Sequence, residues 1–512
     1  MSTATEPRDP APSARSTRLR PNALGFPALI AQSIAVISPT MTAVLIIGLA
    51  FADSGRGTWA AYLFGTIMLL FVVLGLNQFA KRSATAGSMY AYTARGLGPA
   101  AGILSGWTLI WCYLFIAVVG LSGVAIFAAQ LMLSLGIHST VTPLLWFAIS
   151  ASLCGIIAYK DIRVSSLLTL VFEAVSVACI MILAFIVLFK HGFSVDTNAL
   201  KLKGVTIKGM DFAIVICIFS LVGFESATTL GGEAKDPMRT VPRAVIWSLL
   251  ITGAFMVFMS YVEVFATQHG PALGSLTAPL NSIAGAYNVP VFKGLVSLGA
   301  IVSFFSLTLS CLNAGARIIF PLGGHGFLPK RLHAVHARNM TPHAALLTYL
   351  AIIVGVAVAF YAGGWNALTI FGDAGTLAAF GFLTAYFLIA IAAPVYLKKL
   401  GELRTRNLVI AVLGFLCLLV PTVGSFYPAP PSPVNLFPYI FLGYMAIGGG
   451  WLFALNRMQP GTLGDIEASL ERALESSVHA AVDGDGLSID QPPAFEFAPG
   501  ARPGVTTATK PE

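Results

Sequence analysis

The sequence predicts an all-helical integral membrane protein with twelve transmembrane helices. Of its 512 residues, 56% are hydrophobic and only 10% are charged, whereas soluble domains carry about 25% charged residues. The charges lie in short clusters between long apolar runs, and stretches such as 62–76 and 176–189 contain none. Helices are expected because a backbone in lipid must satisfy its own hydrogen bonds, and the alternating apolar and polar segments that indicate a membrane barrel are missing.

The individual helices follow from the lengths of these apolar runs. A helix needs about 20 predominantly apolar residues to cross the hydrocarbon core of a membrane. The twelve candidates lie near 25–50, 58–79, 100–134, 142–158, 164–189, 211–231, 243–267, 290–319, 343–361, 366–397, 407–424 and 434–455.

The distribution of basic residues predicts how these helices are oriented. Lys and Arg cluster at the amino terminus and after every second predicted helix, with twenty residues on that side and six in the opposite loops. Because basic loops stay in the cytoplasm, both termini are expected there, in a multi-pass protein of the cytoplasmic membrane. The net charge of +8 is thus explained by topology, and no nucleic-acid partner is expected.

Two predicted helices contain a break near the centre of the membrane. In the first, Pro39 lacks the N–H that a continuous helix needs, although an ordinary proline kink is the alternative. In the sixth, Gly223 and Glu225 interrupt an apolar segment, and Glu225 lies roughly 21 Å along the axis from Asp211. A carboxylate at that depth requires a partner, a proton or a cavity. Broken helices one and six, running in opposite directions, predict an inverted repeat of five plus five helices.

Three sequence motifs occur in a fixed order along the chain. They read Gly223-Phe224-Glu225 followed by Glu233-Ala-Lys235-Asp236-Pro237-Met-Arg239-Thr-Val-Pro242; Thr85-Ala-Gly-Ser-Met-Tyr-Ala-Tyr92 followed by Gly98 and Gly106-Trp107; and Asn313-Ala-Gly-Ala-Arg317 followed by Gly324-His-Gly-Phe-Leu-Pro329. Together, over about positions 30 to 400, they resemble the motifs of the amino acid–polyamine–organocation (APC) superfamily.

This resemblance implies the leucine-transporter fold and a secondary transporter of amino acids or related amines that works by alternating access. Its partners would be a small-molecule substrate and the lipid bilayer, and it would use no cofactor. Proton-coupled symport is the first expectation. Sodium-coupled or exchange transport of polyamines or other organic cations, and a transporter-like sensor, are the alternatives.

The loop that follows the sixth helix is expected to be structural. Pro237 and Pro242 are expected to end helix six and start helix seven. Glu233, Asp236 and Arg239 are expected to cap helices and pair with one another in solvent at the cytoplasmic surface.

The resemblance places the substrate between broken helices one and six. The start of a half-helix offers free N–H groups to a carboxylate, and the end of a half-helix offers carbonyl groups to an ammonium group. The carboxylate is expected near Ser38, Thr40 and Met41, the ammonium group near the carbonyls of Ala35, Val36 and Ser220, and the substrate side chain against Gly223 and Phe224. The family's GSG or GAG in helix one is replaced here by Ile37-Ser38-Pro39, so specificity for α-amino acids does not carry over.

Helix five contains the candidate ion-coupling residues. Its segment 163–176 is similar to the family pattern, but Ser176 stands where several relatives have a lysine. Glu173, one turn earlier on the same face, either carries a proton or only hydrogen-bonds a neighbouring helix. Alternatively, Ser176 with Ser303 or Ser306 of helix eight holds sodium.

Four further residues are candidates for selectivity or gating. Asp373, about 12 Å into helix ten, either selects a cationic substrate by charge or begins the helix at the mouth of the cavity. Trp107, Tyr113 and Phe304 are candidate gates, with a lipid-facing or core position as the alternative for each.

Other classes of protein fit the sequence less well. An enzyme would need a clustered catalytic set, but four of the eight histidines share one predicted loop, 325–343, and no third ligand accompanies His333 and His336 there. No metal site is therefore expected. A channel or a sensor would share the fold, and only a flux measurement separates these from a transporter.

The chain is expected to divide into four parts. These are a disordered cytoplasmic tail over 1–22, the ten-helix inverted-repeat core over 23–397, helices eleven and twelve over 398–457, and an acidic, largely disordered cytoplasmic tail over 458–512.

Overall fold

The computed structural model describes residues 22–82, 89–137, 141–160, 162–267, 273–276, 278–336, 338–427 and 432–458, with a few positions between 461 and 468. Both predicted tails lie almost wholly outside these residues. Among the described residues every regular element is helical, and the only β pairing is an isolated bridge between Leu24 and Ala234. The all-helical prediction is confirmed.

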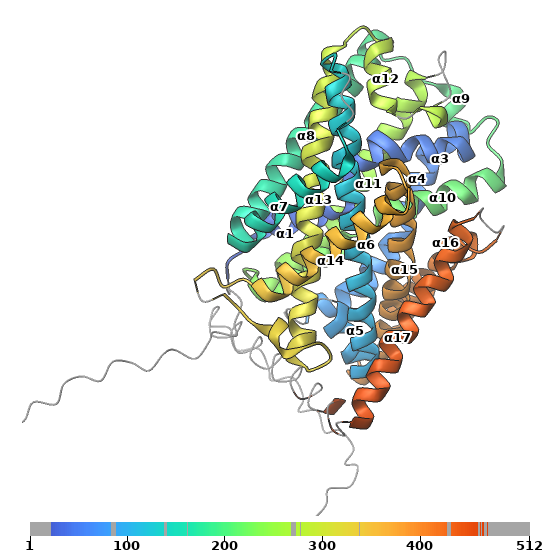
Figure 1. Ribbon diagram of the computed structural model, residues 1–512. Coiled ribbons are helices and arrows are strands. Elements are labelled where there is room, and N and C mark those ends of the chain that lie inside the picture. The colour runs from blue at the N-terminus through green and yellow to red at the C-terminus, as the bar shows by residue number, and fades with distance from the viewer. Residues whose placement is uncertain are drawn as a thin grey trace, which may run out of the picture.

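The helices of the bundle follow the predicted apolar stretches closely (Figure 1). Those of the first half are α1 Phe26–Ile37, α2 Pro39–Met41, a π-helix Thr42–Ile46, α3 Ile47–Ser54, α4 Thr58–Ala80, α5 Met89–Leu97, α6 Pro99–Ser134, α7 Pro143–Lys160, α8 Ile162–Lys190 and α9 Thr197–Leu200. The remainder are α10 Ile207–Leu221, a 3-10 helix Phe224–Glu233, α11 Pro237–Ala266, α12 Pro279–Ala286, α13 Val291–Gly324, α14 His343–Ala362, α15 Ala367–Lys399, α16 Thr405–Gly424 and α17 Phe437–Met458.

Within the part of the chain that the structure describes, eleven helical segments are long and apolar enough to cross a membrane. The first, Phe26–Ala80, has 55 residues and contains both the first and the second predicted helices. At about 1.5 Å per residue it would be far longer than the roughly 30 Å hydrocarbon core, and the 3-10 turn Gly55–Gly57 separates α3 from α4 within it. Figure 1 shows α9 and α12 at one end of the bundle and α5 at the other.

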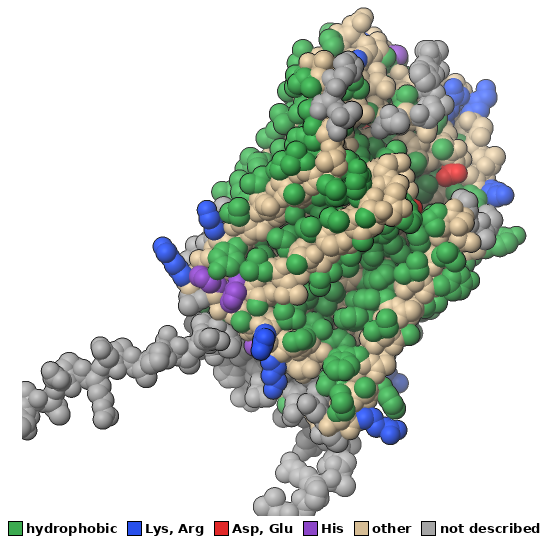
Figure 2. All heavy atoms as spheres, in the orientation of Figure 1, with side chains coloured by type: hydrophobic (Ala, Val, Ile, Leu, Met, Phe, Trp, Pro, Cys, Tyr) green, Lys and Arg blue, Asp and Glu red, His purple; other side chains and the backbone are tan. Residues whose placement is uncertain are grey.

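The flank of the bundle has the composition of a lipid-facing surface. Figure 2 shows hydrophobic side chains over this flank, with Lys and Arg toward the ends. On α7, Leu145, Ile149, Leu153 and Ile156 form one stripe and are each between 42% and 54% exposed. Contiguous apolar surface of this extent is rare on soluble monomers and indicates contact with lipid.

The centre of the bundle is formed by α6, which packs along both α13 and α15. Glycines allow its close approach to α13. A Cβ atom at Gly120 would lie 2.2 Å from Thr308 Oγ1, and one at Gly123 would lie 2.2 Å from the Phe304 ring. Small residues serve this purpose in membrane bundles, where helices associate through close packing rather than through the hydrophobic effect.

Both predicted helix breaks are present, and they touch. Helix α1 ends at Ile37, and Ser38 adopts a left-handed conformation with φ of 50° before Pro39 starts α2. Helix α10 ends at Leu221, and Gly223 has φ of 105°. A Cβ atom on Gly223 would lie 2.5 Å from Val36, so glycine is required both by the backbone conformation and by the contact between the breaks.

The loop after the second break differs from the prediction in two respects. Pro237 does start α11, but Pro242 lies inside that helix rather than at a boundary. Asp236 and Arg239 are exposed, and Arg239 Nη1 lies 3.8 Å from Asp236 Oδ2. Glu233, by contrast, is buried and pairs with Arg317 of α13. The prediction of a solvated Glu233 was wrong because the chain folds back here: Ala23 and Leu24 donate backbone hydrogen bonds to the Glu233 carbonyl and cover it.

Candidate functional site

The break in the first helix redirects its backbone hydrogen bonds. Pro39 has no N–H to give to the carbonyl of Ala35, four residues earlier. The N–H of Thr40 points to Glu173 Oε1 at 3.4 Å, and the N–H of Met41 to Ser38 Oγ at 3.4 Å. The carbonyls of Ala35 and Val36 therefore lose the donors that a continuous helix would supply.

Glu173 of α8 is the centre of a buried polar cluster at this break. Ser303 Oγ of α13 donates to Glu173 Oε2 at 2.6 Å, and Thr40 Oγ1 donates to Glu173 Oε1 at 3.1 Å. Thr40 Oγ1 also lies 2.8 Å from Ser176 Oγ, and Ser38 Oγ lies 3.2 Å from Ser303 Oγ. One carboxylate thus connects α8, α13 and the first broken helix.

Three of the four predicted ion-coupling residues meet in this cluster, and the fourth does not. Ser306 instead donates to the carbonyl of Thr169 at 3.3 Å. Every side-chain ligand in the cluster is a carboxylate or hydroxyl oxygen, which can hold a proton or a hard cation. Among the described residues no group of three or more His, Cys, Asp or Glu residues is placed to hold a metal ion.

A second buried carboxylate, Glu225, lies at the break of the second helix. Tyr113 donates its hydroxyl to Glu225 Oε1 at 2.8 Å, and Tyr386 donates to Glu225 Oε2 at 2.6 Å. The N–H of Gly223 donates to the Tyr386 hydroxyl at 3.2 Å. The two tyrosines belong to α6 and α15, so this carboxylate attaches the break to both of the helices that form the bundle centre.

The sequence did not identify Tyr386 as a functional candidate. The available signal was the need of an intramembrane carboxylate for donors, but nothing local indicates which tyrosine supplies them. Phe224, predicted to shape the pocket, stacks on Tyr386 with ring centroids 5.0 Å apart. Ser220 is buried one turn before the break and donates to the carbonyl of Cys217 at 2.8 Å.

The candidate selectivity and gating residues lie in separate places. Tyr113 belongs to the Glu225 cluster. Phe304 is fully buried between Phe127 and Phe371. Asp373 is 8% exposed and accepts a hydrogen bond from Trp365 Nε1 at 2.8 Å.

Trp107, the remaining gating candidate, contacts the last helix of the bundle. It stacks on Tyr444 of α17 at 4.4 Å and donates to the Tyr444 carbonyl at 3.0 Å.

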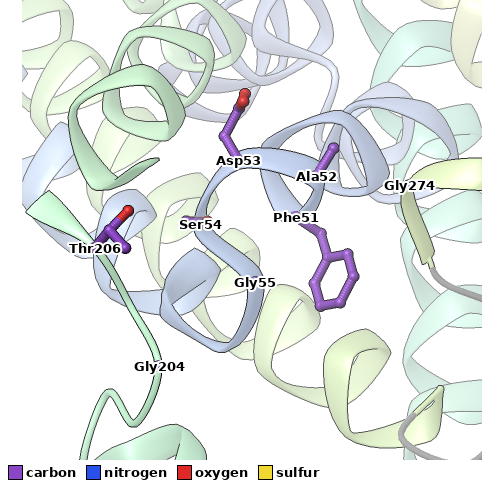
Figure 3. Close-up of a pocket in the computed structure, with 8 residues that line it drawn as sticks. All are labelled: Phe51, Ala52, Asp53, Ser54, Gly55, Gly204, Thr206 and Gly274. Atoms are coloured by element: carbon purple, nitrogen blue, oxygen red, sulfur yellow. The ribbon is translucent and has the colours of Figure 1, made fainter. Parts of the chain in front are cut away.

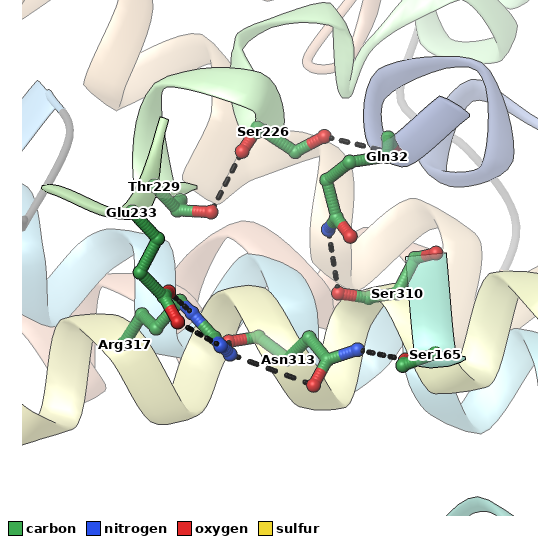
Figure 4. Close-up of polar contacts among 8 residues, drawn as sticks. All are labelled: Gln32, Ser165, Ser226, Thr229, Glu233, Ser310, Asn313 and Arg317. Carbon is green, nitrogen blue, oxygen red and sulfur yellow. Dashed lines mark hydrogen bonds and ion pairs between the residues drawn. The ribbon is translucent and has the colours of Figure 1, made fainter. Parts of the chain in front are cut away.

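A buried polar network ties two segments to α13 (Figure 4). They are α1, before the first break, and the 3-10 segment, after the second break. Arg317 donates to both carboxylate oxygens of Glu233, with Nη2 to Oε1 at 3.1 Å. Asn313 donates to Ser165 Oγ of α8 at 2.6 Å, and Gln32 of α1 donates to the Ser310 carbonyl at 2.8 Å. The network therefore holds both broken helices against α13 and α8.

A cavity of about 510 Å³ opens at the end of α3 (Figure 3). It is lined by Phe51, Ala52, Asp53, Ser54, Gly55, Gly204, Thr206 and Gly274. Among the described residues that line it, Asp53 alone is charged, and its carboxylate favours cationic solutes.

Removal of the Tyr386 hydroxyl tests how far Glu225 depends on its donors. In Tyr386→Phe, the buried carboxylate loses one of two donors and the Gly223 N–H loses its acceptor, at a cost of about 1–3 kcal/mol in unfolding free energy. Thermal unfolding of the purified variant measures this loss. Tyr396→Phe, a tyrosine of the same helix outside the cluster, is the control, and equal stability of the two variants would contradict the assignment.

Comparison with known proteins shows which sequences the chain resembles. The sequence profile of the amino acid permease family matches residues 29–429. The chain is 28% identical to the branched-chain amino acid permease BcaP of Lactococcus lactis subsp. cremoris (strain MG1363), over 71% of this chain and 78% of that protein. It is 25% identical to the low-affinity putrescine importer PlaP of Escherichia coli (strain K12), over 57% and 65%. It is also 25% identical to the serine/threonine exchanger SteT of Bacillus subtilis (strain 168), over 74% and 83%.

Proposed function

The chain belongs to the amino acid permease family and so is a membrane transporter rather than an enzyme. We propose that it carries amino acids or related amines by proton-coupled symport. The observation that carries this proposal is the Glu173 cluster, which places a buried carboxylate directly against the break of the first helix. Alternating access is the proposed mechanism, as expected for a broken-helix transporter.

The ammonium group is the best-supported part of the proposed substrate. The three relatives are named for branched-chain amino acids, putrescine, and serine or threonine, and what these molecules share is an ammonium group. The carbonyls of Ala35 and Val36, and those near Ser220 at the end of α10, are the proposed acceptors. Gly223 and Phe224 would shape the pocket for the remainder of the molecule.

A substrate carboxylate would bind at the start of α2. The N–H groups of Thr40 and Met41 lie there, and their present hydrogen bonds of 3.4 Å are long. Such bonds are weak, so a carboxylate beside Ser38 can replace them. A diamine would not use this position, and the two substrate classes would then share only the ammonium site.

Protonation of Glu173 would act on the contacts between helices. As an anion, the carboxylate accepts from Ser303 of α13 and from Thr40 after the first break. A proton removes negative charge and one acceptor position, which weakens these charge-assisted bonds. Proton binding would thereby loosen the first broken helix from α8 and α13. Sodium held by Glu173 with the hydroxyls of Ser38, Thr40, Ser176 and Ser303 is the second candidate.

The moving unit in this proposal consists of helices one, two, six and seven. These are α1–α3, α4, α10 with the 3-10 segment after it, and α11. Helix α4 packs against α10 and α11, and α1 packs against α11, so these helices can rock together. We propose twelve membrane crossings with α1–α3 and α4 as the first two, a five-plus-five inverted repeat within 23–397, and both termini in the cytoplasm. Helices α16 and α17, within 398–457, would lie outside the repeat.

Gates and selectivity are proposed at four residues in separate places and at the cavity beside Asp53. Trp107, Tyr113 and Phe304 keep their predicted role as gates. Asp373 would favour cationic substrates at the mouth of the site, and the cavity beside Asp53 would serve as the outer vestibule.

Uptake into proteoliposomes tests the function. A pooled set of labelled amino acids and polyamines is offered under a proton gradient, a sodium gradient, or neither. Accumulation that requires the proton gradient is the expected result. Accumulation that follows only sodium would assign coupling to the cation alternative, and binding without movement under any gradient would indicate a sensor.

The break at Pro39 is expected to matter more for transport than for folding. In Pro39→Ala, the N–H at position 39 can bond to the Ala35 carbonyl and extend the helix through the proposed ammonium site. Initial uptake rates should fall by roughly tenfold or more, since a shift of about 1.4 kcal/mol is tenfold, while expression and thermal unfolding stay near wild type. Normal uptake by this variant would show that the break is only a structural kink.

A further inference from the structure

Glu263 is a buried carboxylate that belongs to neither of the clusters described above. It lies three residues before the end of α11 and has no exposed surface. Glu173, Glu225 and Glu233 each accept at least two hydrogen bonds. By contrast, neither carboxylate oxygen of Glu263 has a hydrogen-bond partner among the described residues. A charge buried in the membrane requires a neutralising partner.

Other unsatisfied oxygens lie on the elements that surround α11. Thr42 Oγ1 of the π-helix, Tyr62 Oη of α4 and Asn281 Oδ1 of α12 are buried, and each lacks a hydrogen-bond partner among the described residues. The π-helix, α11 and α12 contact one another, and α4 packs along α11. Tyr62 is within electrostatic reach of Glu263. These unsatisfied oxygens therefore lie on elements that pack against the helix carrying Glu263.

The chemistry of these oxygens favours a metal cation over a proton. Asn281 gives its amide Nδ2 to Ser297 Oγ at 3.0 Å, which leaves its Oδ1 as an acceptor only. A proton on Glu263 would supply one hydrogen bond and leave the other acceptors unsatisfied. A hard cation accepts several oxygen ligands at once, and one carboxylate with neutral oxygens matches a single positive charge.

We propose that Glu263 anchors a sodium site between α4, α11, α12 and the π-helix, with Thr42, Tyr62 and Asn281 as its neutral oxygen ligands. This site is distinct from the Glu173 cluster, which involves α8 and α13. The π-helix that carries Thr42 directly follows the first break, and π-helical turns are frequent at functional sites. Helix α4, which carries Tyr62, also packs against α10, which ends at the second break. Sodium bound here would hold α12 against both broken helices.

Sodium binding without transport is the direct test. The full-length purified protein is unfolded thermally in detergent while sodium chloride replaces N-methylglucamine chloride at constant ionic strength. A saturable rise in Tm with sodium is expected, because a ligand that binds only the folded state stabilises it. In Glu263→Gln the apparent sodium affinity should fall by roughly tenfold to a hundredfold, the loss expected for a charged ligand.

Variants of the proposed neutral ligands give a second test of sodium binding. Tyr62→Phe and Asn281→Ala each remove one proposed ligand and should each weaken sodium binding by a few-fold. The matched control is Glu402→Gln, the same chemical change at an exposed acid, which should leave the sodium response intact. Glu173→Gln tests the other candidate sodium site. Should Glu263→Gln fail to fold, the titrations of Tyr62→Phe, Asn281→Ala and Glu173→Gln decide the question.

Three results would overturn the proposal. The first is a sodium response that survives Glu263→Gln, or one that is unchanged in both Tyr62→Phe and Asn281→Ala. The second is a response that Glu173→Gln abolishes. The third is the absence of any effect of sodium on Tm, whether or not a lower pH stabilises the protein through Glu263. Because the assay needs no substrate movement, its outcome is independent of whether proton-coupled uptake is observed.

Discussion

Replacing Glu173 by glutamine is expected to abolish the accumulation of substrate that a proton gradient drives, while exchange of substrate across the membrane persists. Glutamine keeps the size of the side chain and its acceptor oxygen but cannot take up or release a proton. The coupling free energy between two ligands is typically 1–3 kcal/mol. The accumulation ratio under the gradient should therefore fall roughly 5- to 150-fold, measured as steady-state uptake in proteoliposomes.

Counterflow in the same vesicles distinguishes lost coupling from lost transport. Vesicles preloaded with unlabelled substrate should still exchange it for label when they contain Glu173→Gln. The matched control is Glu402→Gln, the same chemical change at an exposed acid that pairs with Arg82. If Glu173→Gln retains full proton-driven accumulation, the carboxylate serves only to hold α8 against its neighbours.

A serine variant separates the two candidate coupling ions. Ser303→Ala removes the shortest hydrogen bond to Glu173 and also a hydroxyl oxygen. If a proton is the coupling ion, the variant should still couple but with a shifted pH dependence, because the carboxylate has lost a donor that favours its charged form. If sodium is the coupling ion, uptake should instead require more sodium.

The helical architecture could be predicted because it depends on local properties of the sequence. Apolar length alone predicts the long helices, and each predicted stretch overlaps one or more helices of the structure. The breaks were predictable for the same reason, since Pro39 and Gly223 act on the backbone at their own positions. Glu173 and the pair of Ser176 with Ser303 or Ser306 were predicted as alternatives for coupling, and their meeting in one cluster was not predicted from the sequence.

The partners of the buried carboxylates could not be predicted in the same way. Tyr386 is 161 positions from Glu225 and Arg317 is 84 positions from Glu233, and no periodicity relates them. The predicted solvation of Glu233 rested on the usual behaviour of charges at a membrane edge. Apolar length marks where a crossing ends, but it does not show that another segment covers that end, as residues 23 and 24 do here.

Breaking the buried ion pair between Arg317 and Glu233 is expected to give the largest loss of stability of any single change considered. Both side chains are 1% exposed, so Arg317→Ala leaves an unpaired carboxylate in a low-dielectric interior. Loss of one member of a buried pair costs about 3–5 kcal/mol. Arg317→Ala should therefore unfold at a clearly lower temperature than wild type, measured by thermal unfolding in detergent, and Arg338→Ala in a nearby loop serves as the control.

The double variant Glu233→Gln with Arg317→Met tests whether the pair also has a role in transport. Without an uncompensated charge, the double variant should recover most of the stability, because buried pairs replaced by neutral groups of similar size are often no less stable. The pair ties the 3-10 segment after the second break to α13. If this contact forms and separates in each transport cycle, two neutral side chains will not reproduce it. The recovered double variant is therefore expected to remain poor in uptake. If uptake recovers together with stability, the pair only compensates two buried charges and takes no part in closing the transport path.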